Sequence, residues 1–300
     1  MNTRARVTAI PALLAAGTLA SMPRFRRSVA AQDQASPEAA AIPAAWGNLV
    51  LPELNLTVTD VVEGVPDSTE AGRYLLTVTA DPISDGPPPG VMILQLPEGM
   101  SLDEAEAQAH ASPDGPPPFY YEALLAGGAS VDADGTGVSI IDLLPGEWVV
   151  AGTYFSRPPV VFTVNGEMPA ELPEPESTAT FTLAEMTIEI SDGAPVAGEN
   201  VFRIENQGEQ PHFIEIVKVP DGTTEEDAEA WLEADMSGTP VVDLDVEFVT
   251  TTPDQSAGVT QWVTVTLEPG TYEALCFVPD PESGMPHAFM GMHTLFEVAE

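Results

Sequence analysis

The amino-acid sequence predicts an all-β protein made of two tandem Greek-key β-sandwiches, each with a short inserted helix. Three observations support this prediction. Short segments rich in β-branched and aromatic residues alternate with turn residues, the second half of the chain repeats the first, and the long helices of parallel α/β folds are missing. With 300 residues, 44% of them hydrophobic, the chain is long enough to bury two cores of ordinary size.

Each predicted strand needs a second sheet to cover one of its faces, which is the reason for expecting sandwiches rather than single sheets. The strand segments are mainly β-branched or aromatic, and turn-forming residues separate them. We expect strands at residues 54–59, 74–79, 181–190, 201–205, 262–267 and 294–298.

The two halves match at an offset of 123 or 124 residues. Residues 91–99 match residues 214–222, each an apolar strand that ends in a proline and glycine turn. Residues 144–152 match residues 268–276 in the same way. Between these segments, a serine or threonine hydroxyl with an acid three residues later predicts the start of a short helix in each half, at Ser101 and Thr224. The halves are therefore expected to share one fold.

Composition divides the chain into five segments. Residues 1–31 have the features of a signal peptide, because Arg4 and Arg6 precede an apolar run that is too short to span a bilayer. This predicts a secreted or cell-envelope (periplasmic) protein, cleaved near Ala20 or after Ala31, with a retained N-terminal anchor as the alternative. The remaining segments are a flexible leader at 32–45, a first domain at 46–165, a Pro- and Glu-rich linker at 166–178 and a second domain at 179–300.

The chain is strongly acidic, with 47 acidic residues, nine basic residues and a net charge of −38. Five of the basic residues lie in the predicted signal peptide, so cleavage after Ala31 leaves four basic residues and a net charge of −43. This charge argues against nucleic acid as a partner and against contact with anionic membrane surfaces. The acids are spread along the chain, as in a solvated coat that suits either high salt or acidic surroundings.

The residues with the most specific chemistry lie in the second half. A single cysteine rules out an intramolecular disulfide, and this thiol stands in the chain order His212, Cys276, His287, Met292. Strand alternation places Cys276 on the same face as the apolar Tyr272 and Ala274, which points it into the sandwich. Two histidines and a thiolate with a weak thioether form the donor set that suits copper, so we predict one copper ion on these four residues.

The same residues resemble those of the plastocyanin and azurin family of blue copper proteins, the cupredoxins. The resemblance rests on the Asn- and Gly-containing approach to His212 at 206–212, on the Gly-Thr-Tyr strand that leads to Cys276, and on the four residues between His287 and Met292. It implies a cupredoxin-like fold with a type 1 (blue) copper that carries single electrons. It further implies a redox partner protein, expected to have a basic docking surface, and an electron path through a partly exposed His287.

Two departures from the family pattern concern the ligand loops. Ten residues separate Cys276 from His287, which is longer than in plastocyanins although loop closure tolerates the extra length. Phe213 stands where the family often has an asparagine, so a hydrogen bond that would rigidify the loop is expected to be absent.

Other residues compete for the predicted roles. His293 could replace His287, and Met290 or Met285 could replace Met292 or form a soft Cu(I) cluster. His110 is expected on the surface. In the first half, Pro89 aligns with His212 and Gly152 with Cys276, so this half is interpreted as a degenerate cupredoxin-like repeat without metal ligands.

Enzyme activity is not expected, because multicopper oxidases and copper nitrite reductases need additional histidine-bound copper centres and this chain has four histidines. The alternatives to an electron carrier are a copper carrier or scavenger and a metal-free binding module.

Overall fold

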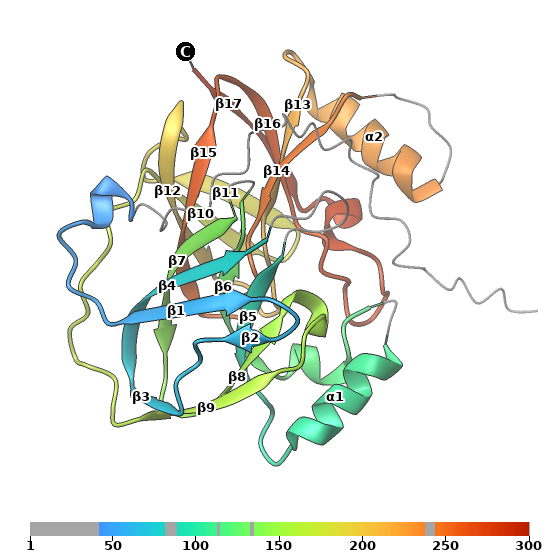
Figure 1. Ribbon diagram of the computed structural model, residues 1–300. Coiled ribbons are helices and arrows are strands. Elements are labelled where there is room, and N and C mark those ends of the chain that lie inside the picture. The colour runs from blue at the N-terminus through green and yellow to red at the C-terminus, as the bar shows by residue number, and fades with distance from the viewer. Residues whose placement is uncertain (1–41, 82–88, 113–114, 133–134, 238–243, 300) are drawn as a thin grey trace, which may run out of the picture.

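A computed structural model describes residues 42–81, 89–112, 115–132, 135–237 and 244–299 (Figure 1). The predicted signal peptide and most of the predicted leader lie outside the described residues. The predicted all-β fold class is confirmed, since two packed sandwiches are built from three sheets and carry one α-helix each. Among the described residues, no helix is both long and apolar enough to cross a membrane.

The first sandwich contains nine strands and helix α1. Four strands lie in one half of an eight-stranded sheet: β1 (Glu53–Val58), β2 (Val62–Glu63), β4 (Gly72–Ala80) and β7 (Thr136–Leu143). The facing five-stranded sheet has β3 (Ser68–Glu70), β5 (Gly90–Gln95), β6 (Leu124–Ser130), β8 (Gly146–Gly152) and β9 (Val160–Asn165). Helix α1 (Leu102–Ala111) and the short 3₁₀ turns η2 (Ala44–Trp46), η3 (Pro118–Tyr121) and η4 (Thr153–Phe155) complete it.

The second sandwich repeats this arrangement. Its half of the eight-stranded sheet holds β10 (Ala179–Ala184), β11 (Thr187–Ser191), β12 (Gly198–Asn206) and β15 (Thr260–Leu267). The facing four-stranded sheet holds β13 (Glu215–Val219), β14 (Glu247–Thr251), β16 (Gly270–Leu275) and β17 (His293–Val298), with helix α2 (Glu225–Ser237) and the 3₁₀ turn η5 (His287–Met290) outside it. Figure 1 shows α1 and α2 far apart, each beside its own sandwich.

The register of the sheets supports the sequence repeat residue by residue. In the first half Ile93 faces Val150, and in the second half Ile216 faces Ala274, which are the residues that the repeat aligns. Both predicted helix starts carry the expected caps, with the Ser101 hydroxyl accepting from the Glu104 N–H and the Thr224 hydroxyl accepting from the Asp227 N–H.

One predicted strand is wrong. Residues 181–190 form a hairpin, β10 and β11, rather than one strand, with Glu185 and Met186 in the turn. Met186 adopts a left-handed conformation at φ 61°, which reverses the chain direction. The apolar residues on both sides of the turn hid it in the sequence. The hairpin leaves Glu185 at the tip, beside the residues that follow β12.

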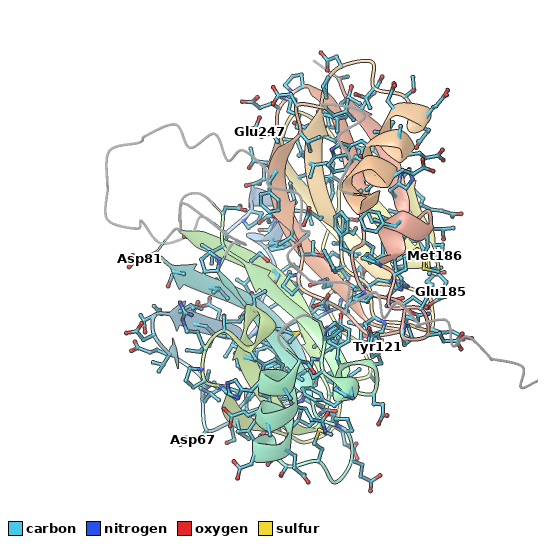
Figure 2. The ribbon with its side chains drawn as sticks, turned by 90° about the vertical axis from the view of Figure 1, so that its right-hand side faces the viewer. Asp67, Asp81, Tyr121, Glu185, Met186 and Glu247 are labelled. Atoms are coloured by element: carbon cyan, nitrogen blue, oxygen red, sulfur yellow. The ribbon has the colours of Figure 1, made fainter. Side chains whose placement is uncertain are left out.

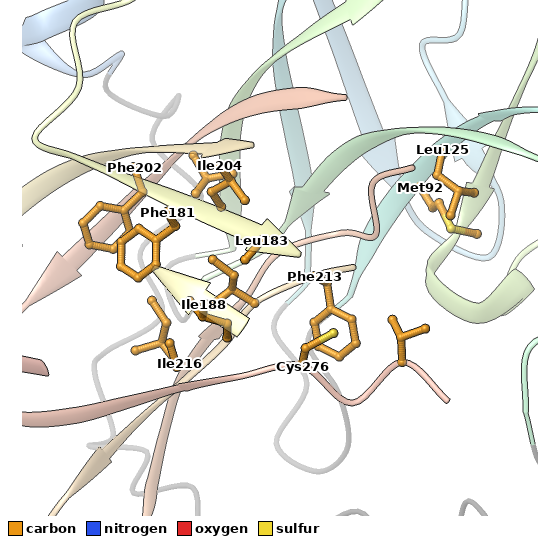
Figure 3. Close-up of a cluster of buried hydrophobic side chains, with 14 of the residues drawn as sticks. Met92, Leu125, Phe181, Leu183, Ile188, Phe202, Ile204, Phe213, Ile216 and Cys276 are labelled. Atoms are coloured by element: carbon orange, nitrogen blue, oxygen red, sulfur yellow. The ribbon is translucent and has the colours of Figure 1, made fainter. Parts of the chain in front are cut away.

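The two halves are joined through one continuous sheet. Strand β7 of the first half pairs with β15 of the second, at Ile140 with Trp262 and at Ser139 with Val263. One buried core also runs through both halves, from Met92 and Leu125 to the residues around Cys276 (Figure 3). The two sandwiches thus share a sheet and a core, and the exact domain limits stay a prediction.

Candidate metal centre

The predicted ligands are brought together at one end of the second sandwich. His212 lies between β12 and β13, Cys276 directly follows β16, His287 opens η5, and Met292 precedes β17. All four side chains are buried. Within the described part of the chain, His212, Cys276 and His287 form the one group of His, Cys, Asp or Glu residues close enough to hold a metal ion.

The distances among these side chains fit a shared metal ion. The Cys276 Sγ atom lies 3.7 Å from Nδ1 of His212 and 3.7 Å from Nδ1 of His287, and the two Nδ1 atoms are 3.2 Å apart. Metal–nitrogen and metal–sulfur bonds of about 2.0 and 2.3 Å that open by about 120° span about 3.7 Å. The three atoms therefore form a triangle that one ion can occupy at its centre.

Cys276 is a buried thiol whose sulfur accepts two backbone hydrogen bonds. Burial raises the pKa of Cys276 to about 12, against the opposing effect of the Phe213 and Val278 N–H groups. At neutral pH the thiol keeps its proton unless a bound metal ion displaces it. Figure 3 shows Cys276 beside the Phe213 side chain, between the group around Phe181 and the pair Met92 and Leu125.

His212 is held by backbone bonds to Gln255 on a neighbouring loop. The His212 N–H donates to the Gln255 carbonyl at 3.0 Å, and the Gln255 N–H donates back at 2.9 Å. Asn206 donates from its side chain to the carbonyls of Gln255 and Gln210. These bonds hold the loop before His212 in place, although Phe213 stands where the cupredoxin family often has an asparagine. Burial, followed by the nearby His287, lowers the pKa of His212 to about 4, which keeps its ring neutral and able to bind a metal.

The first half supports the loop that holds His212. Ala126 of β6 bridges to Gln255 from the side opposite His212, and the Leu125 N–H donates to the Ser256 hydroxyl at 2.9 Å. The hydroxyl of Tyr121 donates to the Pro279 carbonyl in the loop between Cys276 and His287. Figure 2 shows Tyr121 in the first half, at the boundary with the second. The first half therefore packs against the loops that hold the candidate ligands.

The outer nitrogens of both histidines also meet protein groups. Nε2 of His287 lies 3.0 Å from Oε1 of Gln210, and Nε2 of His212 lies 3.4 Å from the carboxylate of Glu185. These contacts leave Nδ1 of each ring for the metal. The sequence reasoning missed both partners: Gln210 lay inside the motif before His212, whereas no sequence signal distinguished Glu185.

The expected exposure of His287 is wrong. The side chain is completely buried, and Oε1 of Gln210 lies 3.0 Å from its Nε2. The covering amide is itself tied to Asp280, whose carboxylate accepts from Nε2 of Gln210 at 3.3 Å. The Nε2 edge of His287 therefore faces Gln210 rather than solvent.

Met292 is the best placed of the competing methionines. Its side chain is buried and its backbone is bonded to two ligand residues, accepting from the Cys276 N–H at 3.2 Å and donating to the His287 carbonyl at 2.9 Å. Met285 and Met290 are each 39% exposed on the surface. The axial role of Met292 stays a prediction that its position supports.

His293 points away from the candidate site, as strand alternation requires. Its Nδ1 lies 3.1 Å from the fully buried carboxylate of Glu273 and 3.8 Å from Glu225 on α2. The hydrogen bond to Glu273 raises the pKa of His293. His293 thus serves the packing of α2 on the sheet.

We expect His293→Ala to leave copper binding unchanged and to lower the free energy of unfolding by about 3–5 kcal/mol, because it leaves Glu273 buried without its partner. The pKa of His293 is raised in the folded protein. Its contribution to the free energy of unfolding is therefore complete below the unfolded-state pKa and is lost as pH rises through the folded-state pKa. Denaturant unfolding as a function of pH measures this. His110→Ala, at an exposed position on α1, is the control. Loss of copper binding in His293→Ala would contradict the assignment.

The first half lacks an equivalent site among its described residues. Gly152 occupies the position of Cys276, and a Cβ atom there would lie 3.0 Å from atoms of Ser156 and Arg157. Pro89 occupies the position of His212, and its carbonyl accepts from the Val131 N–H. The degenerate repeat therefore has a compact strand end where the second half has its ligand loops.

Comparisons with solved structures find matches at low sequence identity. A dithionite-reduced auracyanin from the photosynthetic bacterium Roseiflexus castenholzii is 23% identical over 40% of this chain and 95% of its own, with a TM-score of 0.29. An azurin from Methylomonas sp. strain J is 17% identical over 40% of this chain and 96% of its own, with a TM-score of 0.26. A copper nitrite reductase from Nitrosomonas europaea is 12% identical over 83% of this chain and 94% of its own, with a TM-score of 0.23.

All three proteins are less than 25% identical to this chain. No model of a protein family and no curated protein sequence matches it. The likeness concerns the fold alone, and the chemistry of the site follows from its own side chains. Two imidazole nitrogens, one thiol sulfur and a nearby thioether form the donor set of a type 1 copper centre, and copper is the metal that this set selects.

Proposed function

We propose that this chain is an exported type 1 copper protein that carries single electrons. The observation that supports this best is the convergence of Sγ of Cys276 with Nδ1 of His212 and of His287, three atoms spaced 3.2–3.7 Å apart in a buried site. Copper, when bound, supplies the one-electron couple. The role of the protein is to keep the ligands in one geometry during the change of charge.

The ligand loops are built to resist movement. The backbone N–H and carbonyl of His212 both form hydrogen bonds with the backbone of Gln255. The backbone of Met292 forms hydrogen bonds with Cys276 and His287. The Gln255 side chain donates to the carbonyls of Ile204 and Val259, which ties its loop to β12. Such a preorganised site changes little between oxidation states, which favours fast electron transfer over bond-making chemistry.

The histidine count favours a carrier over an enzyme. Of the four histidines, His212 and His287 belong to the candidate site, His293 is paired with Glu273, and His110 is exposed on α1. A second histidine-bound copper centre would need further ligands. Met285, which lies just before η5, and Met290, the last residue of η5, are on the surface and favour the alternative, a Cu(I) carrier with soft thioether ligands.

Charge around the covered edge of His287 supports a basic partner. Glu185, Glu209, Asp280 and Glu282 lie next to Gln210 or in the loops bonded to it. With a net charge of −38 for the whole chain, a cationic redox protein would be steered toward this region at low salt.

The test is a Cu(II) titration of the full-length protein after signal removal. We expect one copper per chain, an intense visible band from the copper–thiolate bond and a reversible one-electron couple in voltammetry. A colourless Cu(II) complex, or tight binding of Cu(I) alone with a stoichiometry above one, would overturn the proposal and favour the copper carrier.

A further inference from the structure

Glu185 occupies an unusual place for an acidic side chain. It stands at the tip of the β10–β11 hairpin (labelled in Figure 2), far in sequence from the ligand residues. Its carboxylate nevertheless reaches the loop that precedes His212. A turn tip normally extends into solvent, whereas 35% of this side chain is exposed. Most of its surface is therefore covered by the rest of the molecule.

The carboxylate holds that loop by its backbone. Oε1 of Glu185 accepts from the Glu209 N–H at 2.6 Å and from the Gln210 N–H at 2.8 Å. Two N–H groups directed at one carboxylate oxygen favour the charged form of the carboxylate. Gly208 permits the approach, because a Cβ atom there would lie 2.6 Å from the same oxygen.

The same contacts reach both histidines. Nε2 of His212 is buried without a well-aligned hydrogen bond among the described residues, and Oε1 of Glu185 lies 3.4 Å from it. By fixing the Gln210 backbone, Glu185 also positions the Gln210 side chain, whose Oε1 lies 3.0 Å from Nε2 of His287. The Glu185 carboxylate is therefore linked to both histidines, directly to His212 and through Gln210 to His287.

We propose that Glu185 is a positioning residue that fixes both histidine ligands and places a negative charge behind His212, which lowers the reduction potential of the bound copper. This inference rests on the proposed copper function. A negative charge on the far side of a ligand ring stabilises Cu(II) more than Cu(I), because Cu(II) carries the larger positive charge. An acceptor on the outer N–H of an imidazole also makes the ring a stronger donor to the metal.

Two substitutions separate the charge from the hydrogen bonds. Glu185→Gln keeps an oxygen that can accept from Glu209 and Gln210 but removes the charge, so copper should still bind with its colour while the reduction potential rises. Glu185→Ala removes both functions and should weaken copper affinity by about 10–100-fold, the usual effect of losing an outer-shell partner. Glu189→Gln, at an exposed position on β11 of the same hairpin, is the control for a change in net charge alone.

A second readout uses the metal-free protein. Hydrogen exchange of the Glu209 and Gln210 amides should accelerate in Glu185→Ala and stay slow in Glu189→Gln. If the wild-type protein forms no coloured copper complex but this protection pattern holds, the proposed function fails while the positioning role stands. If copper binds as proposed, but Glu185→Gln shifts the potential no more than Glu189→Gln and Glu185→Ala keeps the wild-type affinity, the inference about Glu185 is overturned.

Discussion

Cys276→Ser is expected to abolish the visible absorption of the copper-loaded protein and to reduce its copper affinity by orders of magnitude. The polarizable thiolate gives the site both its colour and its preference for a soft metal, and a serine hydroxyl provides neither. The chain has no second cysteine that could replace it. Visible spectroscopy and competition with a copper chelator measure the two effects.

The fold should survive this substitution, because the serine oxygen can accept the same N–H groups of Phe213 and Val278. Circular dichroism of the variant checks this point. Met292→Leu is the matched control within the site: it keeps the apolar volume and removes one weak axial ligand, so copper and colour should remain while the reduction potential changes. A coloured Cys276→Ser protein would show that the copper lies elsewhere.

Trp262→Ala is expected to destabilise both halves of the molecule together. Trp262 is buried on β15, directly opposite Ile140 of β7, in a cluster that also contains Trp46 and Leu75. The guanidinium of Arg73 lies 4.2 Å from the centre of its ring. Removing such a side chain costs about 3–5 kcal/mol through lost burial and the cavity left behind.

Thermal unfolding followed by two probes tests the coupling. Copper colour reports on the second half, and in a Trp231→Phe background the fluorescence comes from Trp46 and Trp148 in the first half and from Trp262 at the joint. We expect the two probes to give one coincident transition in the wild-type protein. In Trp262→Ala both probes should show the same lowered Tm, and the Tm of Trp262→Phe should lie between those of the wild-type protein and Trp262→Ala. Two separate transitions, of which only that of the second half moves, would show that the halves are thermodynamically independent.

Local patterns were sufficient to predict much of this fold. The capping pairs at Ser101 and Thr224 depend on residues three positions apart, and the strand ends at Gly152 and Cys276 could be aligned because the repeat preserves its Pro-Gly turns. Both aromatic residues that follow these turns make the same bond, with Trp148 donating to the Leu144 carbonyl and Tyr272 to the Glu268 carbonyl. Short-range chemistry of this kind is visible in a sequence.

What the sequence did not reveal depends on contacts between distant segments. The pairing of β7 with β15 has no composition signal, since each strand has the same apolar alternation whether its edge is free or paired. Glu185 is one acid among 47, and its role appears only when the hairpin turn brings it to the loop before His212. The burial of His287 likewise follows from Gln210 folding over its ring.

The joint between the halves has a symmetry of its own. At the repeat offset of 124, β7 and β15 are equivalent strands, and so are Ser139 and Val263, the residues that face each other across the joint. The strand order of the eight-stranded sheet is accordingly symmetric about the joint. From the outer edge inwards, one half has β2, β1, β4 and β7, and the other has their equivalents β11, β10, β12 and β15. The halves thus meet through an isologous contact about a local two-fold axis, the geometry of a homodimer formed within one chain. Because each copy covers the exposed edge of the other, neither strand is left to template aggregation.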